Sequence, residues 1–117
     1  MIIVYGISNC DTVKKARAWL AGQGLACEFH DFKKLGVPAD RLAAWERSVG
    51  WEKLLNRQGT TWRKLDAATQ AGIKDAASAM ALMRDQPSII KRPVVEWGPE
   101  GGATTVGFDP ASWAARL

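Results

Sequence analysis

Hydrophobic and polar positions recur at different spacings along the chain, and each spacing predicts a kind of element. The apolar run at residues 2–5 has the length of a buried strand, and Gly6 follows it. Apolar positions at residues 13–20 have helical spacing, and a pair of glycines after residue 21 ends that helix. Residues 26–32 alternate between two faces, as a second strand does. The first third therefore predicts a strand–helix–strand unit whose two strands are parallel.

The middle of the chain, at about residues 38–86, has helical spacing interrupted by short turns. Asp40 is the expected cap of a first helix, which Gly50 ends. Thr61 is the expected cap of a later helix, and residues 75–84 have apolar side chains along one stripe. We therefore expect an all-helical insertion in this region.

Strand spacing returns in the final third. Residues 93–97 and 104–108 are two apolar runs on either side of a glycine-rich turn at residues 98–103, so they predict an antiparallel hairpin. Asp109 and Pro110 then have the residue types of a helix cap and a first helical position. The predicted order is βαβ, helices, ββα.

Length and composition indicate one globular domain over residues 1–117. Apolar residues make up 47% of the chain and charged residues 24%, which is ordinary for such a domain. The N-terminal apolar run is far too short to span a membrane, so we expect no membrane contact. Cys10 and Cys27 have no metal-ligand spacing, and His30 is the single histidine. We expect no metal site and a reducing, cytoplasmic location for a monomer.

The net charge of +4 is dispersed over the chain. Its densest basic clusters, at residues 14–17 and 33–34, lack the interleaved aromatic residues of a single-strand-binding surface. Three tryptophans of the middle block have helical spacing, which favours core packing over base stacking; they are Trp45, Trp51 and Trp62. We expect no nucleic-acid partner, and the basic charge near Cys10 favours anionic ligands.

Cys10 is the main candidate for chemistry because it lies between the first strand and the first helix. The positive end of the helix dipole and Lys14, one turn further on, both favour the thiolate, which attacks disulfides, peroxides and oxyanions. The alternative is an inert cysteine that packs as a small hydrophobic residue. Cys27, on the predicted second strand, is interpreted as a packed residue rather than a second reactive thiol.

Two motifs about eighty residues apart support the reactive interpretation. Residues 5–16, YGISNCDTVKKA, resemble the active-site segment of the arsenate reductase family, and residues 91–95, KRPVV, resemble its second hallmark, an Arg-Pro pair before a strand. Residues 106–108 resemble the closing strand of that family. The resemblance covers essentially the whole chain. It implies a thioredoxin-like α/β fold, a βαβ…ββα core with an all-helical insertion between its halves.

The chain looks closest to the YffB-type branch of this family, small bacterial proteins thought to be glutathione-dependent thiol reductases. This resemblance implies that Cys10 is the nucleophile, that Arg92 lies beside it and that the Arg92–Pro93 bond is cis. Pro93 would then present its backbone to a bound thiol or peptide. Glutathione is the implied co-substrate, with no bound cofactor, and the substrate is a small-molecule or protein disulfide.

Several neighbours of Cys10 have the chemistry to support the sulfur. The backbone N–H groups of Asp11 to Val13 and the side chain of Lys14 would stabilise a thiolate. Asn9 and Thr12 would add hydrogen bonds to the sulfur. These residues, with Arg92, make up the expected site in the two motifs.

Other features depart from arsenate reductases of this type. The family has an arginine where this chain has Lys14, and it uses an arginine of the middle block, for which Asn56 and Arg57 are the candidates here. A further arginine near the closing strand has no counterpart in residues 106–109. Fewer guanidinium groups should weaken binding of a small polyanion, so a glutathione-coupled arsenate reductase is the second hypothesis.

A third hypothesis is a regulator that binds RNA polymerase, as in the Spx branch of the family. That branch typically has a C-x-x-C switch at this position, where the chain has Val13 in place of the second cysteine. An internal disulfide of that kind cannot form here.

Overall fold

The computed structural model describes residues 2–98 and 102–117. Two compact units make up the chain, and each is described by itself. The first contains Met1–Asp31 and Arg92–Leu117, and the second contains Phe32–Lys91.

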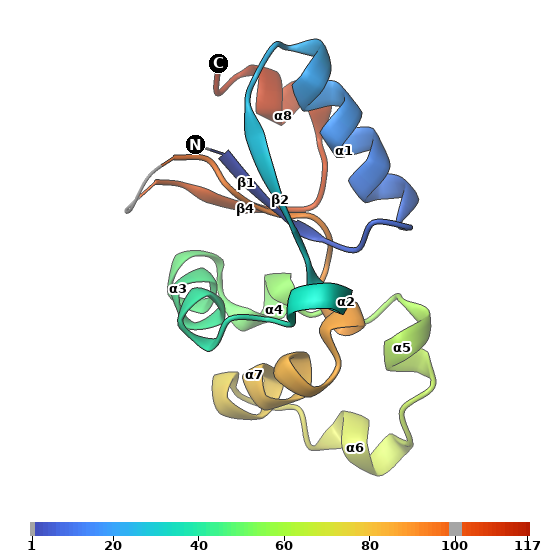
Figure 1. Cartoon of the computed structure of the whole chain (residues 1–117). Helices are drawn as coiled ribbons and strands as arrows, with labels where there is room; N and C mark the ends of the chain where they lie inside the picture. The colour runs from blue at the N-terminus through green and yellow to red at the C-terminus, as the bar shows by residue number, and fades with distance from the viewer. Residues whose placement is uncertain (1, 99–101) are drawn as a thin grey trace. The chain divides into compact units, whose positions relative to one another are not determined.

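A four-stranded mixed sheet forms the centre of the first unit (Figure 1). Its strands are β1 (Ile2–Gly6), β2 (Cys27–Asp31), β3 (Val94–Glu96) and β4 (Thr104–Val106), in the spatial order β2-β1-β3-β4. β1 is parallel to β2 because helix α1 (Asp11–Gly22) makes the crossover between them. β3 is antiparallel to both β1 and β4. The predicted βαβ and ββα halves and the α/β class are confirmed.

The hairpin of β3 and β4 closes through a hydrogen bond from the Trp97 N–H to the Ala103 carbonyl, at 2.9 Å. The glycine-rich turn expected at residues 98–103 falls partly on residues 99–101, which lie outside the described part of the chain. The last helix, α8 (Pro110–Ala114), begins as predicted, with Asp109 accepting from the Ser112 N–H and Pro110 at the first position.

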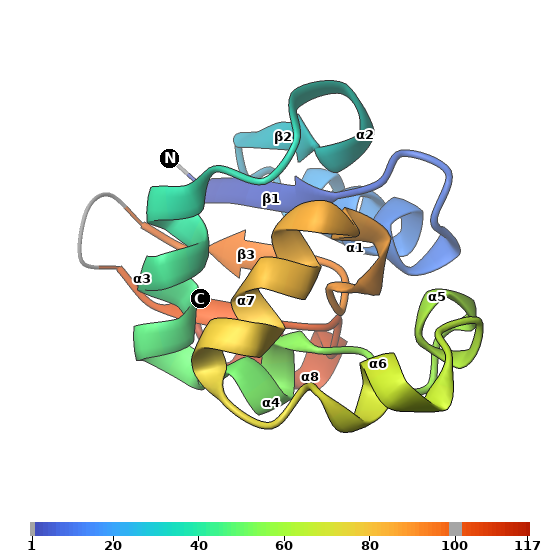
Figure 2. The ribbon, with the colours of Figure 1, turned by 90° about the horizontal axis from the view of Figure 1, so that it is seen from below.

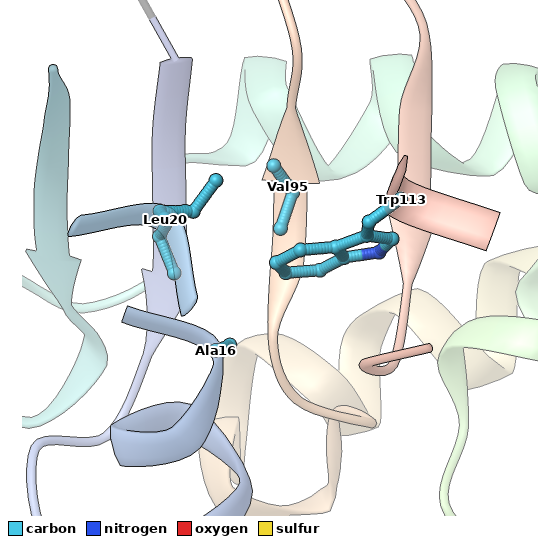
Figure 3. Packing of buried hydrophobic residues seen from close by; sticks show 5 residues of the cluster. Ala16, Leu20, Val95 and Trp113 are labelled. Carbon is cyan, nitrogen blue, oxygen red and sulfur yellow. The ribbon is translucent and has the colours of Figure 1, made fainter. Parts of the chain in front are cut away.

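One face of this sheet carries the core of the first unit (Figure 3). Ala16 and Leu20 of α1 and Trp113 of α8 pack against Val4 and Val95 of the two central strands. The Trp113 ring is also surrounded edge-to-face by three aromatic rings; they belong to Trp19, Trp97 and Phe108, with centroids 5.7, 4.8 and 4.7 Å away. Both helices therefore cover the same face of the sheet.

The second unit consists of short helices (Figure 2). They are α2 (Phe32–Leu35), α3 (Ala39–Val49), α4 (Trp51–Leu54), α5 (Thr60–Arg63), α6 (Ala67–Ala71), α7 (Ala76–Asp85) and the 3-10 helix η1 (Pro87–Ile89). α3 packs against α4 and α7, and α7 against η1. The side chains of Leu42, Trp45 and Met83 are fully buried in this unit. The helical character predicted for the middle of the chain is confirmed.

Three local predictions in this region were wrong. Phe32, expected on the second strand, begins α2 instead, and its ring packs 6.2 Å from that of Trp45. The expected caps also differ: Pro38 is the N-cap of α3 and Gly59 that of α5. Asp40 therefore lies within the first turn of α3, where its charge still complements the helix dipole.

Thr61, the other expected cap, is used differently. It lies inside α5, and its hydroxyl shares a hydrogen bond of 2.9 Å with the Ser88 hydroxyl. A short polar side chain near a helix start thus serves a tertiary contact here instead of capping. Within the described residues, no helix has the length and apolar character needed to cross a membrane.

The core of the first unit gives a stability prediction. Leu20 is fully buried against both central strands, so Leu20→Ala should lower the free energy of unfolding by about 2–5 kcal/mol, through lost burial and a residual cavity. Leu117→Ala is the control, because that side chain is 60% exposed and should change stability by no more than about 0.5 kcal/mol. Urea unfolding followed by circular dichroism measures both. Equal effects of the two substitutions would contradict the described core.

Candidate functional site

Cys10 is the N-cap residue of α1, with extended backbone dihedral angles. Its N–H donates to the Ile7 carbonyl at 3.2 Å, and its carbonyl accepts the N–H of Lys14 at 2.9 Å, the first bond of the helix. The close approach of Val13 to the end of β1 fixes this helix start, since a Cβ on Gly6 would lie 2.7 Å from a Val13 methyl carbon. The thiol is therefore held at a defined point by backbone geometry.

The pKa of the Cys10 thiol is set by opposing effects. Burial raises it, but the backbone N–H of Val13, the Arg92 side chain and the backbone N–H of Thr12 stabilise the thiolate. Arg92 acts both through a hydrogen bond and through its positive charge. The stabilising interactions outweigh burial, so the pKa lies below the ordinary value of a thiol and the thiolate is favoured.

The sheet topology explains how Arg92 reaches a cysteine 82 positions earlier in the sequence. β3 is antiparallel to β1, and Val94 pairs with Tyr5 near the end of β1. Arg92 precedes β3 by two residues, so it lies at the same edge of the sheet as the loop that carries Cys10. Its half-buried side chain then contacts the sulfur.

The bond between Arg92 and Pro93 is cis, as the resemblance implied. Pro93 itself is buried, and its carbonyl accepts the Gly107 N–H at 2.9 Å. That carbonyl therefore joins the segment before β3 to the residue after β4. The contact expected between the Pro93 backbone and a bound thiol or peptide stays a prediction.

The remaining predicted residues near Cys10 lie at the surface. Asn9, Asp11, Thr12 and Lys14 are all exposed. Thr12 supports the sulfur with its backbone N–H, and the cation that lowers the pKa is Arg92, whereas Lys14 contributes a backbone bond to the Cys10 carbonyl. The structure thus brings Cys10, Thr12, Val13 and Arg92 together.

Arg57 and Asn56 belong to the second unit, in the loop between α4 and α5. The Arg57 guanidinium lies over the rings of Trp51 and Trp62. Both tryptophans were expected in the core, but they are only half-buried. No sequence spacing predicts this arrangement, because the two rings and the cation come from two helices and the loop that joins them.

Cys27 lies too far along the sheet to pair with Cys10. It begins β2 and pairs with Ile2, the first residue of β1, whereas Cys10 follows the other end of β1. Ile2 and Gly6 are four residues apart, about 13 Å at strand spacing, while a disulfide requires Cα atoms within about 7 Å. Cys27 instead packs against the core of the first unit, as its interpretation from the sequence proposed.

A buried polar contact within the sheet was not predicted from the sequence. The Tyr5 hydroxyl donates to a Glu96 carboxylate oxygen at 3.1 Å, and both side chains are buried. The His30 ring lies 5.0 Å from that of Tyr5. No sequence spacing predicts this contact, because its partners come from three strands that only the sheet order brings together.

Comparison with known proteins assigns the arrangement to a family. A model of the ArsC family matches residues 5–116. The solved structure of a YffB protein is 49% identical, covers 100% of this chain and 99% of its own, and has a TM-score of 0.91. That of an arsenate reductase (ArsC) related protein from Brucella melitensis is 50% identical, with a TM-score of 0.75 and coverage of 97% and 92%. An uncharacterized protein of Haemophilus influenzae is 37% identical over 117 residues, 100% of this chain and 99% of its own.

The contact between Arg92 and Cys10 gives a prediction for pH dependence. The alkylation rate of Cys10 follows its thiolate fraction, so a lowered pKa places the midpoint of the rate profile at lower pH than for an ordinary thiol. Arg92→Gln removes a hydrogen bond and a positive charge, and its midpoint should move to higher pH. Rates of iodoacetamide reaction against pH measure the shift.

Lys14→Gln is the matched control, since it removes one exposed positive charge next to the same helix start. We expect its midpoint to stay near that of the unsubstituted protein. An unchanged midpoint in Arg92→Gln would contradict the described role of Arg92.

Proposed function

Because the chain belongs to the ArsC family, we propose that it is a glutathione-dependent thiol reductase in which Cys10 is the nucleophile. The observation that carries this proposal is the stabilised thiolate at the start of α1, supported by the Val13 N–H and by Arg92. A thiolate is the form that attacks a disulfide sulfur. We place the reaction in the cytoplasm, carried out by a monomer without a bound cofactor.

The first step is attack of the Cys10 thiolate on a mixed disulfide between glutathione and a small molecule or protein. The sulfur of Cys10 bonds to the glutathione sulfur, and the substrate sulfur leaves as a thiolate, which takes a proton from water. The substrate is thereby reduced and Cys10 becomes glutathionylated. Arg92 would stabilise negative charge on the sulfurs during this exchange.

The second step needs a thiol from solution. Val13 stands where a C-x-x-C motif has its second cysteine, and Cys27 lies at the opposite end of β1. A second glutathione, as thiolate, would attack the mixed disulfide on Cys10 and release oxidised glutathione. Cys10 leaves as a stabilised thiolate, because a lower pKa makes a better leaving group.

The remaining site residues have supporting roles in this proposal. The backbone N–H of Asp11 and the side chains of Asn9, Thr12 and Lys14 would support the sulfur or bind polar groups of the glutathione. Pro93 would border the bound disulfide. Arg57 is proposed as a substrate-binding residue.

Intact-mass analysis after treatment with oxidised glutathione tests this proposal. We expect one glutathione adduct on the unsubstituted protein and on Cys27→Ser, and no adduct on Cys10→Ser. Reduced glutathione should then remove the adduct. A Cys10–Cys27 disulfide, or an adduct that persists in Cys10→Ser, would overturn the one-thiol scheme.

Arsenate reduction coupled to glutathione is the second candidate, because a relative that is 50% identical is described as an arsenate reductase (ArsC) related protein. Two features weigh against it here: Lys14 stands where arsenate reductases have an arginine, and the carboxylate of Asp109 caps α8 beside the closing strand. We therefore expect arsenate-dependent oxidation of glutathione at the background rate, under conditions in which a glutathione mixed disulfide is reduced. Arsenate turnover that disappears in Cys10→Ser would favour the second candidate.

A regulator that binds RNA polymerase is the third candidate. Val13 is fully buried against Gly6, so this part of the helix serves packing instead of a disulfide switch. The thiol chemistry proposed above does not depend on such a partner.

A further inference from the structure

One side of α1 carries a row of side chains that begins at the reactive thiol. Lys14 and Arg17 follow Cys10 by four and seven positions, so the three residues lie along one side of the helix. Ala16 and Leu20 pack toward the sheet (Figure 3), whereas Lys14 and Arg17 are exposed. Seven residues of helix rise by about 10 Å, which is therefore the separation of Cys10 and Arg17 along the axis.

The Arg17 side chain rests on an aromatic ring of β2. Its guanidinium carbon lies 4.2 Å from the ring centroid of Phe29, well within the roughly 6 Å over which an aromatic face attracts a cation. Phe29 is half-buried and packs against the core of the first unit, so its ring is held in place. A restrained Arg17 loses less side-chain freedom when it binds a ligand, which favours affinity.

Stacking on Phe29 also determines which part of Arg17 meets a ligand. A guanidinium over a ring uses its π surface for that contact, and its N–H groups project in the plane of the group. The fork that these donors form matches the two oxygens of a carboxylate. Arg17 is therefore prepared for a carboxylate that approaches along the exposed side of α1.

The exposed residues of α1 are charged, polar or small. Three are basic and one is acidic; they are Lys14, Lys15 and Arg17 against Asp11. The exposed residues of the last turns are Ala18, Ala21 and Gly22, so a partner backbone can approach the helix there. This surface suits an acidic, polar segment of a partner and offers little to an apolar one.

The separation of Cys10 and Arg17 indicates the size of that partner. In an extended protein segment, a residue three positions from a cysteine lies about 10 Å from it. This matches the rise of α1 from Cys10 to Arg17. A small thiol without an acidic group at such a distance cannot bridge the two residues, whereas a protein segment can.

We propose that Cys10, Lys14 and Arg17 form a recognition surface for acidic protein substrates. Arg17 binds a carboxylate of the segment whose cysteine is in the mixed disulfide attacked by Cys10, and Phe29 is the positioning residue that holds Arg17. This inference rests on the thiol chemistry proposed for Cys10 and names the class of its substrate. Arg17 acts on the choice of substrate, and Arg92 acts on the sulfur.

Exchange with activated peptides tests the proposal in the full-length protein. Two peptides have a single cysteine, activated as its mixed disulfide with thionitrobenzoate, and carry either Glu or Gln at the third position on both sides of it. The Cys10 thiolate attacks the peptide sulfur, and thionitrobenzoate leaves as a coloured thiolate that reports the rate. The rate of Cys10→Ser, whose remaining thiol is Cys27, is subtracted. The reaction needs no glutathione, so it proceeds even where glutathione-dependent turnover is absent.

We expect the unsubstituted protein to react about threefold to fivefold faster with the Glu peptide than with the Gln peptide at low ionic strength, as for an exposed ion pair. Salt at about 1 M should remove this preference by screening. In Arg17→Gln the ratio of the two rates should fall below about twofold. A ratio near one in the unsubstituted protein, or an unchanged ratio in Arg17→Gln, would overturn the proposal.

Arg116→Gln is the matched control for charge. Its guanidinium is also exposed and also lies over a ring, 5.6 Å from the centroid of Trp97. Trp97 follows β3, at the end of the strand away from Arg92 and Cys10. We expect Arg116→Gln to keep the rate ratio of the unsubstituted protein. Equal losses in Arg17→Gln and Arg116→Gln would overturn the proposal, because the preference would then follow net charge.

The positioning role of Phe29 has its own pair of variants. Phe29→Tyr keeps an aromatic face and should keep the rate ratio, whereas Phe29→Leu keeps apolar bulk without the ring and should lower it. Arg17 and the net charge are unchanged in both variants. Equal ratios in the two would overturn the role of Phe29, and circular dichroism shows in each case that the protein is folded.

Discussion

The backbone N–H groups at the start of α1 are the constraint on which the proposed chemistry depends. The first turn of any helix has N–H groups without intrahelical acceptors, and a polar side chain at the N-cap normally accepts from them. Here the N-cap residue is Cys10. A neutral thiol is a weak hydrogen-bond acceptor and a thiolate is a strong one. The backbone N–H groups of the first turn therefore favour the ionised form of Cys10. The reactivity proposed for Cys10 thus follows from ordinary helix geometry.

The sheet order adds the second element of this environment. Because β3 lies next to β1 and runs antiparallel to it, the residues that precede β3 are brought to the end of β1 that leads to Cys10. Strand pairing therefore explains how Arg92 reaches the sulfur. The same pairing buries Val95 against α1 and α8, so the strand that Arg92 precedes is part of the core of the first unit.

Periodicity was sufficient for the elements of the sheet and for the helical character of the middle block. It failed where several residues could serve the same local role. Asp40 and Thr61 are good caps by type, but the N-caps lie two residues earlier, at Pro38 and Gly59, and Thr61 bonds to Ser88 instead. Phe32 fits strand alternation, yet packing against Trp45 places it in a helix.

The residues of the candidate site also differ in how well the sequence predicted their positions. The location of Cys10 between a strand and a helix, and the support of backbone N–H groups, followed from the sequence itself. The proximity of Arg92 came from the family resemblance, because no spacing relates two residues so far apart. Neither the sequence pattern nor the family resemblance predicted the rings around Arg57, because their positions depend on how two short helices and their connecting loop are arranged.

A single thiol in such a cycle has conflicting requirements. As an attacking group it benefits from a high intrinsic nucleophilicity, which falls as the pKa falls, whereas as a leaving group it benefits from a low pKa. Burial of Cys10 raises the pKa of its thiol, whereas the hydrogen-bond donors around the sulfur lower that pKa. That balance suits the proposed cycle, in which the sulfur attacks one disulfide and is then expelled from another. A protein whose second cysteine lies within reach of the first can divide these roles, whereas here Cys27 of β2 lies beside the other end of β1.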